Sequence, residues 1–122
     1  MDRRKFRHLV EEALDTLPPE FRERVDNVEI LVEDEPSPAQ IKTAGLDPNE
    51  DTLFGLYEGV PLTEREHNFA MALPDRITIF YRPLAESFQS AAEIREQIRV
   101  TVIHEIAHFF GMDEDEIEDL GY

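Results

Sequence analysis

Two histidines and a glutamate lie close together in the segment His104-Glu105-Ile106-Ala107-His108, inside an apolar stretch of the chain. On a helix, residues four positions apart lie about one turn apart on the same face, so both imidazoles can bind one metal ion. Glu105 is turned by roughly 100° around the helix axis from His104, which places its carboxylate beside such an ion. The spacing therefore predicts His104 and His108 as metal ligands and Glu105 as a general base.

This pattern, H-E-x-x-H on a helix, is typical of zinc-dependent peptidases. A catalytic zinc takes three protein ligands and a water molecule, whose pKa falls towards about 7. Glu105 can accept the proton of that water as it attacks a peptide carbonyl, and can then deliver the proton to the leaving amine. We expect one Zn²⁺ and hydrolysis of an amide bond. The alternative is that both histidines are core residues whose rings are hydrogen-bonded without a metal.

A third metal ligand must come from outside this segment, and acidic residues follow the turn that Gly111 predicts: Asp113, Glu114, Asp115 and Glu116. We prefer Glu114, which stands where H-E-x-x-H-x-x-G-x-x-H proteins carry their third histidine. Asp113 has a simpler role as a helix N-cap. Water or His67 can complete the site instead, and the acidic run can also be a solvated helix start without any ligand role.

The composition favours a peptide or protein partner over nucleic acid or membrane. The 122 residues predict a single domain, 1–122, with one core. Twelve Lys and Arg against 28 Asp and Glu give a formal net charge of -16, which repels phosphate backbones and anionic lipids. The charge attracts cationic peptides, although keeping the protein in solution is its simplest role. Because there is no cysteine, any metal must bind to histidine and carboxylate.

No targeting segment can be recognised. The first residues are basic, but Glu11 and Glu12 interrupt the chain before a secretory apolar core could form. The most apolar stretch, 100–112, is too short to span a bilayer and contains His104, Glu105 and His108. We therefore expect a cytoplasmic protein.

Alternation and β-branched residues predict three strands, at 28–33, 53–58 and 76–81, the last closed by Pro83. The loop 61–75 between the second and third strands is long enough to cover an active site. Gly55 lies inside the second strand and marks a bulge, a plain irregularity or a close backbone approach, where an extended substrate could lie along the sheet edge.

Helical spacing predicts an amphipathic helix from Phe6 to Leu17, ended by Pro18 and Pro19. Ser37 and Gln40 form a capping box for a short helix before Gly45, and Ser90 and Glu93 form one for a long helix that continues to Gly111. From Val100 onwards this helix is apolar almost all round, which predicts burial. Asp113 caps a last short helix, on which Ile117 and Leu120 are expected to pack back.

A donor for the oxyanion of the transition state cannot be chosen from the sequence. The candidates are Tyr57, Tyr81, Tyr122, His67 and several arginines, and each also has an ordinary packing or surface role. His8 is expected at the surface, beside Arg4 and Glu12.

With these motifs the chain resembles the minimal zincin-like metallopeptidases of bacteria over nearly all of its length. The segments that carry the likeness are 53–63, 74–80 and 104–111. The resemblance implies a reduced zincin α+β domain, with a small mixed sheet packed on an active-site helix and an N-terminal helix behind. It also implies zinc ligands at His104 and His108 and the general base at Glu105.

Proteins of this kind carry H-E-x-x-H-x-x-G-x-x-D, whereas here Glu114 stands in place of the aspartate. The resemblance implies a zinc metallopeptidase that acts on peptides, but a fold alone does not determine activity. Two other hypotheses remain: a zincin-fold binding or interaction module that does not cleave peptides, and a metal hydrolase for a small non-peptide amide.

Overall fold

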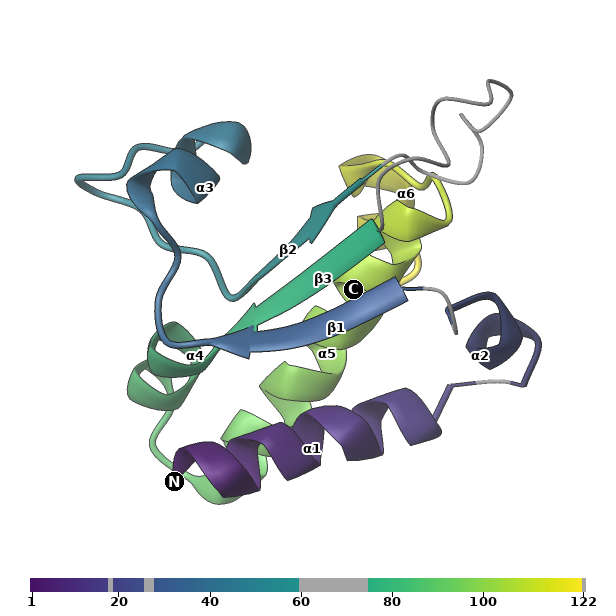
Figure 1. Ribbon diagram of the computed structural model, residues 1–122, viewed down its shortest axis with the longest axis horizontal. Coiled ribbons are helices and arrows are strands. Elements are labelled where there is room, and N and C mark those ends of the chain that lie inside the picture. Colours follow the sequence, from purple (N-terminus) through teal and green to yellow (C-terminus); the bar gives the residue numbers. More distant parts are fainter. Residues whose placement is uncertain (18, 26–27, 60–74, 122) are drawn as a thin grey trace.

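The computed structural model describes residues 1–17, 19–25, 28–59 and 75–121, which form a mixed α+β domain. In these residues a three-stranded sheet is accompanied by six helices (Figure 1). The strands are β1 (Val28–Glu33), β2 (Gly55–Glu58) and β3 (Asp75–Phe80). The helices are α1 (Arg3–Asp15), α2 (Pro19–Val25), α3 (Pro38–Thr43), α4 (Tyr81–Ser87), α5 (Ala91–Phe109) and α6 (Glu114–Asp119). This agrees with the predicted reduced zincin-like fold.

The sheet has the strand order β1-β3-β2, so β3 lies in the centre and β2 at an edge. β1 runs parallel to β3, from the pair Val28–Asp75 to the pair Glu33–Phe80, and β2 runs antiparallel to β3. The amide of Phe80 donates to the carbonyl of Phe54 at 2.9 Å. In an antiparallel pair the backbone groups of every second residue bond to the partner strand. Because Phe54 bonds to β3, Leu56 and Glu58 also face β3, and the backbone groups of Gly55 and Tyr57 point to the other side of β2.

Helix α5 packs across β2 and β3 and is covered by α1, as Figure 1 shows. Its Ile98, Val102, Ile106 and Phe109 are buried in the same core as Phe6 and Val10 of α1 and Ile77 and Ile79 of β3. No residue of α5 from Gln97 onwards is exposed, which confirms the predicted burial of its apolar half. The polar side chains of His104, Glu105 and His108 therefore lie on a part of α5 that has little access to solvent.

The predicted caps are present. Ser37 Oγ accepts from the amide of Gln40 at 3.1 Å, and the Gln40 side chain accepts in return from the Ser37 amide. Ser90 Oγ accepts from the amide of Glu93 at 3.1 Å and so begins α5. Asp113 and Glu116 form a second complete capping box at the start of α6. These short-range signals fix where three helices begin.

Two helices were not predicted, because their prolines were interpreted as stops. Pro19 lies at the first position of α2, where its missing amide hydrogen leaves no bond unmade. Pro83 lies in the first turn of α4 for the same reason, so β3 ends at Phe80 and the chain enters a helix at once. The second predicted strand is also shorter than expected and begins only at Gly55.

The prediction for Leu120 was wrong. Ile117 is completely buried, whereas Leu120 follows the last residue of α6 and is 62% exposed. The predicted loop 61–75 lies outside the described residues except for Asp75, which begins β3. Among the described residues, no helix is both long enough and apolar enough to cross a membrane.

Candidate metal centre

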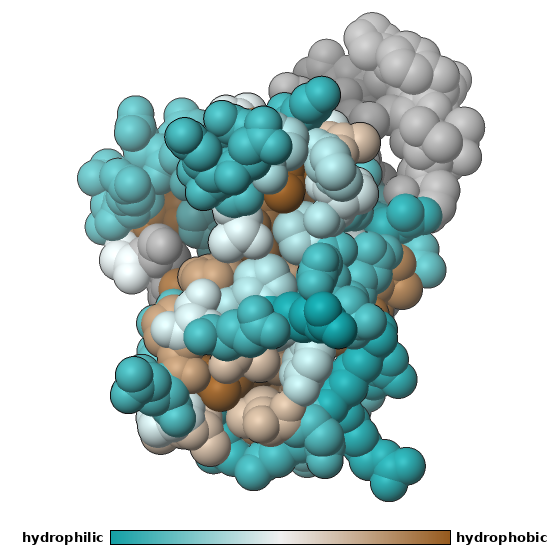
Figure 2. Space-filling view, turned by 90° about the vertical axis from the view of Figure 1, so that its left-hand side faces the viewer, coloured by the Kyte–Doolittle hydropathy of each residue, from teal (hydrophilic) through white to brown (hydrophobic). Residues whose placement is uncertain are grey.

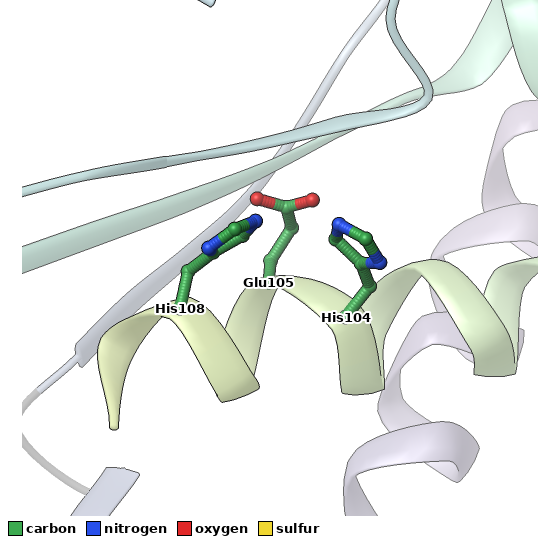
Figure 3. A group of neighbouring side chains, drawn as sticks. All are labelled: His104, Glu105 and His108. Carbon is green, nitrogen blue, oxygen red and sulfur yellow. The ribbon is translucent and has the colours of Figure 1, made fainter. Parts of the chain in front are cut away.

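Helix α5 presents His104, Glu105 and His108 together, with the Glu105 carboxylate between the two imidazoles (Figure 3). One ligand atom from each of the three residues lies within 4.8 Å of the others. The ring centroids of the two histidines are 4.9 Å apart and their planes make an angle of 71°. Both rings are mostly buried, with side chains 23% and 26% exposed, so they face a recess rather than open solvent.

Glu114 approaches both histidines from α6. Its Oε1 atom lies 3.1 Å from Nε2 of His104 and 2.8 Å from Nε2 of His108. Partial desolvation raises the pKa of Glu114, but hydrogen bonds and charge interactions with the two histidines outweigh it and lower the pKa overall. Glu114 is thus the residue of the acidic run that meets the two imidazoles.

A turn between α5 and α6 brings Glu114 to this position. Gly111 has φ +87°, and its amide donates to the carbonyl of His108 at 2.9 Å. The next amide, of Met112, donates to the carbonyl of Ala107 at 3.1 Å. This pair of bonds is a Schellman motif, which needs a residue in the left-handed region and explains the glycine. The Met112 carbonyl then lies 3.3 Å from Nδ1 of His108.

The donor set fits zinc. Two imidazole nitrogens and one carboxylate oxygen form the His₂Glu combination found in catalytic zinc sites. Donors bonded at about 2.0 Å to a tetrahedral zinc lie about 3.3 Å apart. The Nε2–Oε1 distances of 3.1 and 2.8 Å are within a few tenths of an ångström of that spacing. A proton on Nδ1 of His108 can bond to the Met112 carbonyl, which leaves Nε2 with its lone pair for a metal.

Glu105 differs from Glu114 in its surroundings. It is only 7% exposed, and the backbone amide of Tyr57 in β2 hydrogen-bonds to its carboxylate. Burial raises the pKa of Glu105, although the nearby His108 and His104 and the Tyr57 amide favour the charged form. A buried carboxyl with a perturbed pKa in a cleft has the properties of a candidate acid or base.

A cleft of about 690 Å³ opens onto these groups. Its walls come from β2, from the residues after α3, and from the end of α5 and the start of α6, and the apolar ones are Ala44, Leu46, Leu53, Leu56 and Met112. A smaller cavity of about 320 Å³ continues past Gly55 towards Gln97 and Thr101. Figure 2 shows a mostly hydrophilic face with an apolar area in its lower part.

The other predicted site residues lie elsewhere or have other partners. The Tyr57 hydroxyl donates to Asp75 Oδ1 at 2.8 Å, and the Tyr81 hydroxyl donates to the carbonyl of Met1. Asp113 is the N-cap of α6, in agreement with its simpler role. His8 is at the surface beside Glu12, as predicted. His67 and Tyr122 lie outside the described residues.

Two groups near the site could not have been found from side-chain types. They are the carbonyl of Met112 and the amide of Tyr57, and both are backbone groups. For the Met112 carbonyl, the one available signal in the sequence was Gly111, which predicted a turn. The sequence left three interpretations of Gly55 open, and the structure supports a close approach, since the residue lies against the side chains of Thr101 and Glu105 of α5.

The comparison with known families agrees with this geometry. Residues 25–122 match the family model described as zincin-like metallopeptidase. The chain belongs to this family. No curated protein matches the chain. Among solved structures, a conserved hypothetical protein from Thermus thermophilus is similar to this zincin-like chain, with a TM-score of 0.59 and 22% identity. The likeness covers 98% of this chain and 97% of that one, and at this identity it shows the fold alone.

Proposed function

We propose that this zincin-like protein is a zinc-dependent metallopeptidase in which His104, His108 and Glu114 hold one ion. One observation carries the proposal: a single carboxylate oxygen of Glu114 lies 3.1 and 2.8 Å from the Nε2 atoms of the two histidines. These three donors are of the kinds that zinc prefers, and the buried carboxylate of Glu105 lies in one cluster with the two histidines.

The proposed general base is Glu105. Zinc, when bound, polarises a carbonyl oxygen and lowers the pKa of a coordinated water towards about 7. The Glu105 carboxylate accepts the proton of the attacking water and returns it to the leaving amine. Its burial supports the first step, because a carboxyl whose pKa is raised accepts a proton more readily than an exposed one does.

The proposed substrate is an extended peptide segment along β2. In the described part of the sheet β2 is an edge strand, and the backbone groups of Gly55 and the carbonyl of Tyr57 face away from β3, whereas the Tyr57 amide already bonds to Glu105. An extended chain can add to such an edge through backbone hydrogen bonds, with alternate side chains in pockets. The cleft beside β2 has apolar walls that include Leu46, Leu53 and Met112, and so can receive an apolar side chain of the peptide.

Three variants test this proposal. Purified protein should hold one zinc per chain by elemental analysis, and His104→Ala should hold none. Glu114→Gln should lower the affinity for zinc by at least about 100-fold, since it replaces an anionic ligand with a neutral amide. Glu118→Gln, on the same helix, should leave zinc binding unchanged and serves as the matched control.

Peptide cleavage should be measured on a broad peptide library. Glu105→Gln should keep its zinc but lose about 10²- to 10⁴-fold in rate, because the general base is removed while the ligands stay. If the wild type retains zinc but is as inert as Glu105→Gln, the peptidase proposal is wrong and the alternative of a binding module with the same fold is favoured. If no zinc is retained at all, the metal site itself is contradicted.

A further inference from the structure

We infer that Gly55 is a positioning residue for Glu105, because its lack of a side chain lets β2 approach α5 closely enough for the Tyr57 amide to hold the Glu105 carboxylate. The proposed function enters only in naming Glu105 as the base. The contact between strand and helix can be tested without any activity.

The space at Gly55 is too small for a side chain. A Cβ atom there would lie 2.7 Å from Cγ2 of Thr101, 3.1 Å from Cγ of Glu105 and 3.3 Å from Cδ1 of Ile79. The first distance is far below a normal contact between carbon atoms. Thr101 is buried and β-branched on a helix, so its methyl group has little freedom to move away. An alanine at position 55 must therefore push β2 and α5 apart or displace Glu105.

The glycine is required for space rather than for backbone conformation. The glycines with positive φ are Gly45, Gly59, Gly111 and Gly121, and Gly55 is not among them. Alanine can adopt the backbone conformation of residue 55, so any effect of Gly55→Ala comes from contacts with neighbouring groups. Two of the three nearest neighbours, Thr101 and Glu105, belong to the helix that carries the proposed metal ligands.

The pairing register of β2 with β3 explains why the close approach of Gly55 to α5 affects Glu105. Leu56 and Glu58 turn their backbone groups towards β3, whereas Tyr57 turns its amide to the open edge. This outward amide would otherwise meet solvent, but it hydrogen-bonds to the Glu105 carboxylate. Gly55 sits two residues away on the same strand and sets how far this amide is from α5.

The orientation of a general base matters for its rate. Glu105 has flexible side-chain torsions, and the Tyr57 amide fixes the direction of its carboxylate. An error of about 1 Å in the position of a reacting group can lower a rate by about 10²-fold. Separation of β2 from α5 should therefore impair proton transfer while the histidines and Glu114, which come from α5 and α6 alone, still bind zinc.

Amide hydrogen exchange, followed by NMR, tests the contact directly. In Gly55→Ala the Tyr57 amide should exchange at least about 10-fold faster than in the wild type, which corresponds to loss of one hydrogen bond to a charged group. The amides of Leu56 and Glu58 report pairing with β3 and should keep their protection. The double variant Gly55→Ala with Thr101→Ser removes the methyl group that clashes and should restore protection of Tyr57.

Val10→Ala is the control for lost stability, because it opens a cavity in α1 away from β2. It should leave the exchange of Tyr57 close to the wild-type rate. Unchanged protection of Tyr57 in Gly55→Ala overturns the inference, and so does a double variant that exchanges as fast as the single one. Both outcomes can be read even if the protein cleaves no peptide, which separates this inference from the proposed function.

The kinetic test then addresses the base. If wild type cleaves peptides, Gly55→Ala should lower kcat by about 10- to 100-fold with one zinc still bound, and the double variant should recover most of this loss. A change confined to KM would mean that Gly55 serves substrate binding at the strand edge and not the positioning of Glu105. Val10→Ala should keep the wild-type kcat.

Discussion

The carbonyl oxygen of Met112 lies 3.3 Å from Nδ1 of His108, and it is the turn at Gly111 that brings it there. A hydrogen bond from Nδ1 fixes the ring orientation and leaves Nε2 to face Glu114 and the proposed metal. One glycine turn thus orients the proposed ligand His108 and also leads into the helix that carries Glu114.

Gly111→Ala should weaken zinc binding by about 10- to 100-fold, the usual effect of disturbing a group that orients a ligand. It should also destabilise the fold by about 1–2 kcal/mol, because φ is +87° at this position. Gly45→Ala is the matched control, since Gly45 also has positive φ, +81°, but ends α3. The control should lose similar stability and keep its zinc affinity. Chelator competition and thermal unfolding measure the two quantities, and equal zinc affinities in the two variants would contradict the role of the turn.

Ile117 is the one buried side chain of α6, so we expect it to hold Glu114 in place. Ile117→Ala should destabilise the protein by about 2–5 kcal/mol and lower its zinc affinity, because α6 loses its contact with the core. Leu120→Ala removes an exposed side chain of similar size and should change neither quantity by much. Titration with zinc and urea unfolding distinguish the two variants. A zinc affinity that survives Ile117→Ala would mean that Glu114 is not a ligand or is held by other contacts.

Removal of the metal should lower stability. A ligand that binds only the folded state at 100 times its Kd adds about 2.7 kcal/mol, which for a domain of this size raises Tm by roughly 10 °C. Thermal unfolding with EDTA and with added zinc measures the difference. His104→Ala should show the same Tm under both conditions. If the Tm of the wild type is also the same with EDTA and with added zinc, this would argue against a zinc site in the folded state.

Glu105 should make the metal-free protein less stable as the pH rises. Burial raises the pKa of Glu105 in the folded state above its ordinary value of 4.5. Below the ordinary pKa, Glu105 is protonated in both the folded and the unfolded state, so it does not change the free energy of unfolding. Above this pKa the unfolded state loses the proton first, which stabilises the unfolded state relative to the folded one. Metal-free Glu105→Gln should therefore be more stable than the metal-free wild type at neutral pH, and equally stable in strong acid.

Urea unfolding in the presence of EDTA at several pH values checks this expectation. Glu11→Gln, at an exposed position of α1, controls for the loss of one negative charge from an acidic protein. If both variants respond to pH in the same way, the burial of Glu105 has no effect on stability.

Much of the fold follows from short-range signals. Ser37, Ser90 and Asp113 were each predicted as helix starts, and each cap is present because the side chain and the amides it accepts from lie within one turn. The prolines at 19 and 83 were misleading, since the same residue that ends one element is tolerated in the first turn of the next. The prediction that Leu120 packs against the core was wrong, because the helical pattern does not fix the direction of a side chain just past the end of a helix.

The site was only partly accessible from the sequence. The ten-residue spacing singled out Glu114, and the structure brings it to both histidines, but its role as a ligand stays a prediction. The Tyr57 amide could not have been predicted, because its direction depends on the register of β2 against β3. Long-range pairing of strands sets that register, and a single residue type does not encode it.

The ligands proposed for zinc lie within one short corner of the chain, since His104 and Glu114 are ten positions apart. An ion held there closes only a small loop and restricts few of the conformations open to the unfolded chain. Release of such an ion would require only α5 and α6 to separate at the Gly111 turn, because β1, β3 and α1 supply none of the proposed ligands. We therefore expect that a zinc ion bound there would be exchanged or lost without unfolding of the whole domain.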